Sequence, residues 1–369
     1  MAGDAQSFLA KIWASRVHVH HTEPDRLVGL LSFEDVDHLL TSTAIRTPAV
    51  RIAQDGSVLP TSRYTRAGAS LAGEALTGLV DARKVLELFD GGATVVLQGL
   101  HRYWPPLREL TAQLELDLGH PCQANAYLTP PGSQGFPVHS DSHDVFVFQT
   151  HGTKLWEIHG EDGPEEVLLE PGLSMYLPTG TPHAARAQGG ASLHVTIGIN
   201  QLTWRGVLRR AVAGLVDGLP DEHLPAGYLE DTSVLAVGLA DRLVALAADL
   251  RGLPTAGVVE LEVQRFLTSR PTRQRRGLVD VLAVRDLTDS TPLRRRPGHP
   301  CVLVTAGERL RVLLGDRVLE VPARLRPALE EIRIRADLTP ADLGGVLDAS
   351  DRLVLCRRLV REGLLEVLS

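Results

Sequence analysis

Three residues in the middle of the chain have the side chains of a mononuclear metal site. His139 and Asp141 are separated by one serine, and His183 follows further along. Two imidazoles and one carboxylate can occupy one face of an octahedral metal and leave the opposite face open. A non-haem Fe(II) oxygenase needs that open face for its co-substrate and for O2. On an extended strand, both side chains of the H-x-D triplet would project to the same face.

The residues before His183 support this prediction, because a bare H-x-D triplet is weak evidence. Gly172, Pro178, Gly180 and His183 have the spacing G-x5-P-x-G-x2-H, which predicts a strand, a tight turn and a return strand. Such a turn can present His183 to the earlier pair. We therefore favour a metal site over surface or core residues with local hydrogen-bond partners. A Zn(II) hydrolase remains an alternative for the same ligands.

Lys154 is the next candidate, because lysine is rare in this chain. Lys11, Lys84 and Lys154 are the only lysines, and arginine supplies every other cation. A lysine kept amid such a bias indicates a need for a compact point charge, and the distal carboxylate of 2-oxoglutarate is a suitable partner. Composition alone supports an ordinary solvent-exposed lysine equally well.

Composition describes an ordinary globular protein of 369 residues, with 44% hydrophobic and 22% charged residues. The net charge of −7 argues against a protein built for nucleic acid or an anionic membrane. The three cysteines have no C-x-x-C spacing and fit a reducing compartment. We see no signal peptide and no apolar run of transmembrane length, so we expect a soluble, cytoplasmic protein.

The pattern of hydrophobic residues divides the chain into three parts. Up to about residue 120, helix and strand signals alternate, and from 121 to 200 short strands are separated by glycine and proline. Regularly spaced short strands favour a double-sheet jelly roll. Residues 203–270 have helical periodicity, and 270–276 resemble a linker. The leucine stripe of 234–250 is too apolar for an exposed linker, so we expect a homodimer interface there; packing onto the chain's own jelly roll is the alternative.

The surroundings of the triplet resemble a known family. Residues 125–141, from Asn125 through Tyr127 to the H-x-D triplet, and residues 152–156, which contain Lys154, resemble the JmjC-type ribosomal oxygenases. Residues 90–101 and the order of parts are also similar. The resemblance implies a cupin-type enzyme that uses Fe(II), 2-oxoglutarate and O2. It also implies hydroxylation of an arginine or histidine side chain in a ribosomal or other protein or peptide.

The resemblance also implies roles for individual residues. His139, Asp141 and His183 would be the iron ligands, and Lys154 would pair with the C5 carboxylate of 2-oxoglutarate. The residues that would face the co-substrate are Asn125, Tyr127, Thr196 and His194. His194 reaches this set by strand alternation from Thr196, and a pocket histidine without a catalytic role is an equal alternative. The chain departs from the cupin pattern at Ala187, where a polar residue is often found.

We therefore predict an α+β protein with three domains. They are a JmjC/cupin catalytic domain (1–202, with the jelly-roll core, a double-stranded β-helix, at about 90–200), a helical dimerisation region (203–275) and a C-terminal winged-helix-like domain (276–369). The mixed charge of the last domain makes nucleic-acid binding an unfavoured hypothesis. Two further alternatives are the same chemistry on a small molecule or natural-product peptide, and a ligand-sensing regulator with a DNA-binding winged helix. His18, His20 and His21 are interpreted as strand residues, and His143 and His151, which could touch substrate, as solvent-facing loop residues.

Overall fold

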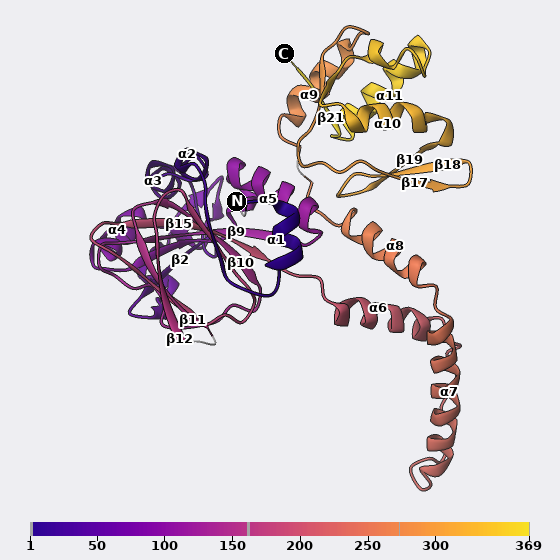
Figure 1. Cartoon of the computed structure of the whole chain (residues 1–369), viewed down its shortest axis with the longest axis horizontal. Coiled ribbons are helices and arrows are strands. Elements are labelled where there is room, and N and C mark those ends of the chain that lie inside the picture. The colour runs from indigo at the N-terminus through magenta and orange to yellow at the C-terminus, as the bar shows by residue number, and fades with distance from the viewer. Residues whose placement is uncertain (1–2, 161–162, 273, 369) are drawn as a thin grey trace. The chain divides into compact units, whose positions relative to one another are not determined.

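The computed structural model describes residues 3–160, 163–272 and 274–368. The chain divides into two compact units, residues 1–201 and 202–369, which we describe separately (Figure 1). The further boundary near residue 275 stays a prediction. Within the described residues, no helix has both the length and the apolar character needed to cross a membrane.

Two facing antiparallel sheets build the first unit and confirm the predicted α+β jelly roll (Figure 1). The large sheet has the spatial order β1 (His18–His21), β13 (Leu173–Leu177), β10 (Asp144–His151), β15 (Ser192–Ile199), β9 (Cys122–Thr129), β8 (Thr94–Leu97), β2 (Val50–Gln54) and β3 (Ser57–Val58). The small sheet has the order β12 (Gly163–Leu169), β11 (Lys154–Gly160) and β14 (His183–Ala187). Three strands of the large sheet, β1 to β3, come from before residue 90. The core range predicted from the sequence omitted them.

Alternation along the strands divides their side chains between two environments. In β9, Ala124, Ala126 and Leu128 join the apolar core on the outer face of the large sheet, and Tyr127 lies on the opposite face, toward the small sheet. Strand β15 pairs with β9 so that His194 lies opposite Tyr127. The inner face therefore holds polar residues in a space closed by both sheets.

Helices cover the outer face of the large sheet through a shared core that includes Phe8, Val36, Leu107 and Phe148. These helices are α1 (Ala5–Lys11), α2 (Pro24–Val28), α3 (Phe33–Thr41), α4 (Ala82–Asp90) and α5 (Pro105–Leu118). Helix α3 begins with a capping box, in which the side chains of Ser32 and Asp35 each accept a hydrogen bond from the other's backbone N–H. The remaining short elements are η1 (Thr61–Arg63), η2 (Leu100–Arg102) and two hairpins, β4 (Thr65–Arg66) with β7 (Leu79–Val80) and β5 (Ser70–Leu71) with β6 (Glu74–Ala75).

The H-x-D triplet does not lie on a regular strand, which corrects the sequence-based prediction. It lies in the loop between β9 and β10, whose first half contains Pro130, Pro131 and Pro137. Proline has no N–H to donate to a sheet, so a continuous strand is disfavoured here. The loop instead makes two isolated bridges to β14, Gln134 with Arg186 and His139 with His183. In the second, His139 N donates to His183 O at 3.0 Å and His183 N donates to His139 O at 2.8 Å.

The second unit begins with three helices, α6 (Trp204–Asp217), α7 (Ser233–Gly252) and α8 (Thr255–Phe266). Arg210 of α6 and Glu262 of α8 form an ion pair, with Nε and Oε1 2.6 Å apart. The rest of the unit has its own apolar core, which includes Leu329 and Leu359. Its elements are α9 (Gly277–Ala283), η3 (Val284–Asp286), β16 (Leu293–Arg295), β17 (Val302–Ala306), β18 (Arg309–Leu313), β19 (Val318–Pro322), η4 (Ala323–Leu325), α10 (Arg326–Ile334), β20 (Asp337–Leu338), η5 (Pro340–Leu343), α11 (Ala349–Arg361) and β21 (Leu365–Val367).

The turn that leads into Lys154 gives the first testable prediction. Gly152 has φ +62°, and a Cβ atom placed on it would lie 2.0 Å from the backbone oxygen of Ala191. Gly132 has φ +68° and open space around it, so it is a matched control. The left-handed backbone costs both alanine variants about 1–2 kcal/mol, but only Gly152→Ala adds a backbone overlap. We expect it to lose at least ~2 kcal/mol more than Gly132→Ala in urea unfolding. Equal losses would contradict the turn geometry.

Candidate metal centre and its pocket

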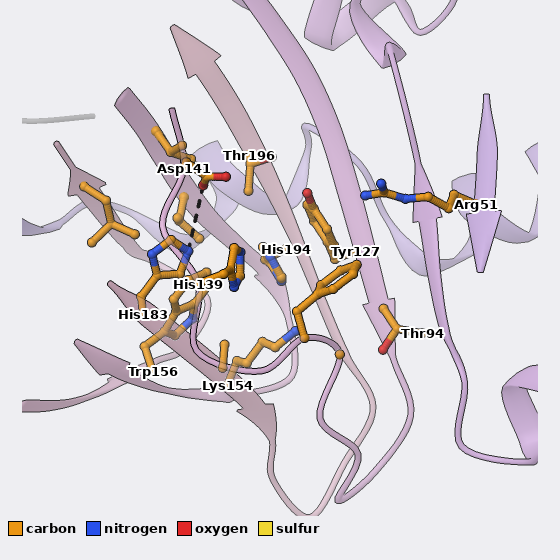
Figure 2. A pocket seen from close by; sticks show the side chains of 16 residues that line it. Arg51, Thr94, Tyr127, His139, Asp141, Lys154, Trp156, His183, His194 and Thr196 are labelled. Carbon is orange, nitrogen blue, oxygen red and sulfur yellow. Dashed lines mark ion pairs between the residues drawn. The ribbon is translucent and has the colours of Figure 1, made fainter. Parts of the chain in front are cut away.

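The three predicted ligands meet at one point of the first unit (Figure 2). His139 and Asp141 come from the β9–β10 loop, and His183 is the first residue of β14. Their donor atoms all lie within 4.8 Å of one another, and His183 Nε2 is 3.8 Å from Asp141 Oδ2. This is the only group of three or more possible ligands found among the described residues. One carboxylate and two imidazoles in this space form a donor set suited to a metal with open positions.

Both histidines are oriented for a metal by backbone carbonyls. His139 Nδ1 lies 2.9 Å from the oxygen of Pro137, and His183 Nδ1 lies 2.9 Å from the oxygen of Thr181. If each Nδ1–H donates to its carbonyl, the lone pair of each Nε2 is left for a metal. Burial also lowers the pKa of His183, which favours the neutral imidazole that metal coordination needs.

A buried carboxylate holds the turn that carries His183. Asp144, at the start of β10, accepts hydrogen bonds from Thr179 N at 2.8 Å and from Thr179 Oγ1 at 2.6 Å. Gly180 N donates to Asp141 O at 2.9 Å. These contacts tie the β13–β14 turn to the β9–β10 loop, so the segments that carry the three ligands are held together on both sides.

The ligands line a cavity of about 280 Å³ between the two sheets (Figure 2). Lys154 lies in its wall and is only 3% exposed. Its Nζ donates to Thr129 Oγ1 at 3.0 Å, and Thr94 Oγ1 donates to the same hydroxyl at 3.2 Å. No ion pair joins Lys154 to a carboxylate among the described residues. Burial lowers the pKa of this amine to about 7.

Aromatic side chains form another part of the wall. The rings of Tyr127 and His194 stack with centroids 4.9 Å apart and planes 4° apart. Burial holds the pKa of His194 well below its ordinary value, so its ring is neutral. His194 Nδ1 and Trp156 Nε1 are buried without a hydrogen-bond partner among the described residues. Unpaired polar atoms beside a buried amine fit a polar, anionic ligand in this cavity.

The cavity brings together most of the residues singled out from the sequence. The predicted residues that line it are His139, Asp141, Lys154, Tyr127, His183, His194 and Thr196. Asn125 is not among the lining residues, and its amide oxygen accepts a hydrogen bond from Gly99 N at 3.0 Å. Its contact with a co-substrate therefore stays a prediction without support from this geometry.

Arg51, Thr94 and Phe136 also line the cavity, and sequence reasoning did not single them out as site residues. A single arginine in a short strand usually faces solvent, so strand alternation gave no reason to choose Arg51. Thr129, whose hydroxyl accepts a hydrogen bond from Lys154, lies within the segment 125–141 but was not predicted to be a site residue. The hydrogen-bonded chain of Thr94, Thr129 and Lys154 joins three strands, and no local spacing rule reveals it.

Known proteins are similar to the segment that contains this site. The sequence profile of the JmjC domain matches residues 108–166 and 161–207. The chain is a member of the JmjC family, related to the ribosomal oxygenases. It is 30% identical over 298 residues to the bifunctional lysine-specific demethylase and histidyl-hydroxylase NO66 of Branchiostoma floridae, covering 69% of this chain and 49% of that protein. It is 28% identical over 244 residues to human ribosomal oxygenase 1, covering 59% and 36%.

A solved structure supports the fold of this JmjC protein along its length. The Escherichia coli ribosomal oxygenase YcfD matches with a TM-score of 0.55 and 18% identity, covering 99% of this chain and 98% of that one. Another structure of YcfD contains cobalt and 2-oxoglutarate. The family expected from the sequence is confirmed. The chain spans about a fifth to a half of the length of the curated relatives that it matches.

The buried amine of Lys154 makes stability depend on pH. In the unfolded chain it titrates near its ordinary value of 10.5, but in the folded protein at about 7. Between these values the unfolded chain holds the extra proton, so the free energy of unfolding rises as the pH rises through this window. From pH 7 to pH 9 we expect the wild type to gain on the order of 2 kcal/mol over Lys154→Met, whose thioether does not titrate. Urea unfolding at both pH values measures this gain, and parallel curves for the two proteins would contradict it.

Proposed function

We propose that this JmjC protein is an Fe(II)- and 2-oxoglutarate-dependent dioxygenase that hydroxylates an amino-acid side chain of a protein or peptide. The observation that carries the proposal is a pair of features in one cavity: an open-faced group of two histidines and one aspartate, and a buried lysine without an acidic partner. A Zn(II) hydrolase would use the first feature but would leave the second without a role.

Each residue has a part in this proposal that follows from its chemistry. His139, Asp141 and His183 hold Fe(II), and Lys154 with Thr129 binds the distal carboxylate of 2-oxoglutarate. Bound there, the iron and the 2-oxo acid supply the activation of O2 that converts a substrate C–H bond to C–OH. The apolar side chains of Val145 and Val147 keep water from this part of the cavity.

A carboxylate beside Lys154 favours the charged amine, so binding of the co-substrate reverses the effect of burial. At a pH above 7 the amine would therefore take up a proton as 2-oxoglutarate binds. Tyr127 and His194 remain neutral because burial raises the pKa of the phenol and lowers that of the imidazole. They can shape the cavity and donate or accept hydrogen bonds without adding charge.

The substrate class rests on the named relatives. Ribosomal oxygenases and a histidyl-hydroxylase are among them, which supports a histidine side chain of a ribosomal protein as the target. An arginine target rests on the sequence resemblance alone. Such a substrate also supports a cytoplasmic location, where ribosomes are available. The cavity is open on the side of His139, which is exposed, whereas His183 is buried. A side chain on a larger partner could therefore reach the metal.

Turnover of 2-oxoglutarate without added substrate tests the chemistry. We expect the Fe(II)-loaded wild type to form succinate, and His139→Ala to lower the rate at least ~100-fold because it removes a ligand. Lys154→Met should raise the KM for 2-oxoglutarate at least ~10-fold because it removes the charge that binds the distal carboxylate. Lys11→Met, which changes an exposed lysine of α1, is the matched control and should retain wild-type kinetics. Full activity in both site variants would rule out the proposal.

The second unit supports a further proposal, that the protein is a homodimer. Helices α6, α7 and α8 lie wholly within the described ranges, and none of their residues is buried. In α7, Leu239, Leu243 and Leu250 lie on one face of the helix and are 55%, 55% and 39% exposed. An apolar face of this size on a 20-residue helix fits a second copy of the same chain. The helical region 203–275 would then be the dimerisation region.

The mass in solution tests this proposal. At micromolar concentration we expect twice the mass of the chain, which is 40.0 kDa. Leu239→Glu should shift the mass toward the monomer because it places a charge in the apolar interface. Glu260→Gln on α8, a change at an exposed polar position, is the control. A monomeric wild type in multi-angle light scattering would contradict a dimer.

The C-terminal part, 276–369, we propose to be a winged-helix-like domain that does not bind nucleic acid. Its small sheet β17–β18–β19 follows the strand β16, and α11 packs in the same core. Many of its arginines are already paired with acids, among them Arg317 with Asp316 and Arg352 with Asp289. Paired guanidinium groups leave fewer charges for phosphates.

A further inference from the structure

Arg51 is a second cation in the cavity, and the proposed chemistry gives it no role. Arg51 lies on β2, opposite Val96 of β8. Val96 lies opposite Tyr127 of β9, and Tyr127 lies opposite His194 of β15. These four residues form one row across the inner face of the large sheet. Figure 2 shows the Arg51 side chain reaching toward Tyr127 from the side of the pocket opposite His183.

The guanidinium of Arg51 has an aromatic neighbour but no acidic one. Its carbon Cζ lies 5.6 Å from the centre of the Phe136 ring, in the loop that leads to His139. Its Nε is buried and has no hydrogen-bond partner among the described residues. No ion pair joins Arg51 to a carboxylate in the described ranges. The buried Arg296 of the other unit also has an unpaired Nε, but its terminal nitrogens are paired with Asp280 and Glu366. A buried donor left unpaired is costly and is typical of a site for a ligand.

The charges of the proposed site leave Arg51 uncompensated. Fe(II) brings two positive charges and Lys154 brings one. Asp141 brings one negative charge and 2-oxoglutarate brings two, so these charges cancel, and the histidines and Tyr127 are neutral. The guanidinium of Arg51 is then the one surplus charge that lines the cavity. In a site of low dielectric, such a charge favours an anion and opposes a second cation.

We propose that Arg51 binds a carboxylate of the substrate, so that the substrate carries an acidic side chain or a chain terminus within a few residues of the oxidised position. The planar guanidinium can bind both oxygens of a carboxylate at once. The distal carboxylate of the co-substrate already has Lys154 and Thr129 as partners. This inference rests on the proposed function and narrows it, because an arginine target would bring a second guanidinium next to Arg51. A histidine target, which is neutral, fits better.

Peptide binding to a non-reacting form of the enzyme tests the inference. The protein is loaded with Mn(II) and 2-oxoglutarate without O2, and dissociation constants are measured by calorimetry. The probes are heptapeptides with a central histidine and capped ends. One peptide has no charged residue. Four have a single aspartate, placed one or two residues before or after the histidine, and four have asparagine at the same positions. A last probe has the neutral sequence shortened by one residue, so that it ends in a free carboxylate two residues after the histidine.

The wild type should bind at least one aspartate peptide ~10-fold more tightly than the matching asparagine peptide, or the free-terminus peptide ~10-fold more tightly than the capped neutral peptide. A preference of this size is expected for a charge-assisted hydrogen bond. The aspartate and free-terminus peptides distinguish the two sources of the carboxylate. The preference should fall to less than ~2-fold in Arg51→Gln, because glutamine keeps hydrogen-bond donors but lacks the charge. Arg63→Gln, at an exposed position of the same unit, is the matched control and should keep the preference.

Three results would overturn the proposal. They are a wild type that does not prefer any acidic peptide, an Arg51→Gln variant that keeps the preference, and a ~10-fold weaker binding of 2-oxoglutarate in Arg51→Gln, which would assign Arg51 to the co-substrate. Failure of the proposed function would be seen separately, because succinate formation by the wild type needs no peptide. An enzyme that forms succinate but lacks the peptide preference would refute only the role of Arg51.

Discussion

The site depends on the pair of backbone hydrogen bonds between His139 and His183. This isolated bridge joins an irregular loop to the first residue of β14, so two ligands from distant parts of the chain are aligned by main-chain atoms. Their side chains are then free to turn Nε2 toward the shared point, because carbonyls of the same two segments hold each Nδ1. The buried carboxylate of Asp144 secures the turn on the other side. The metal site is therefore part of the connection between the two sheets.

Much of this arrangement was predictable, because the relevant signals are local. The three ligands could be predicted from the types and spacing of His139, Asp141 and His183 alone. The short alternating patterns between 121 and 200 predicted strands, and the structure has strands there. The capping box of α3 is also local. Each of these features is decided by neighbours in sequence, so tertiary packing had little room to change it.

The features that sequence reasoning missed are decided by packing across strands. Pro130, Pro131 and Pro137 interrupt the sheet before the triplet, and isolated long-range bridges replace the expected strand. Arg51 faces the cavity only because β2 pairs with β8 at a particular register, which its five residues do not specify. Asn125 was predicted to face the co-substrate, but it does not line the cavity. Strand alternation puts it on the same face as Tyr127, yet its amide is engaged by Gly99, outside the cavity wall.

The gradient of exposure along the three ligands has a kinetic consequence. His139 is exposed, Asp141 is partly exposed, and His183 and Lys154 are buried. Under the proposed function, a large substrate bound over the exposed His139 would cover the metal side of the cavity that leads to the buried Lys154. Loading would then have an order, with the co-substrate entering before the peptide and its product leaving after the peptide departs. A peptide that dissociates slowly would hold succinate in the enzyme, so release at the open face would limit turnover.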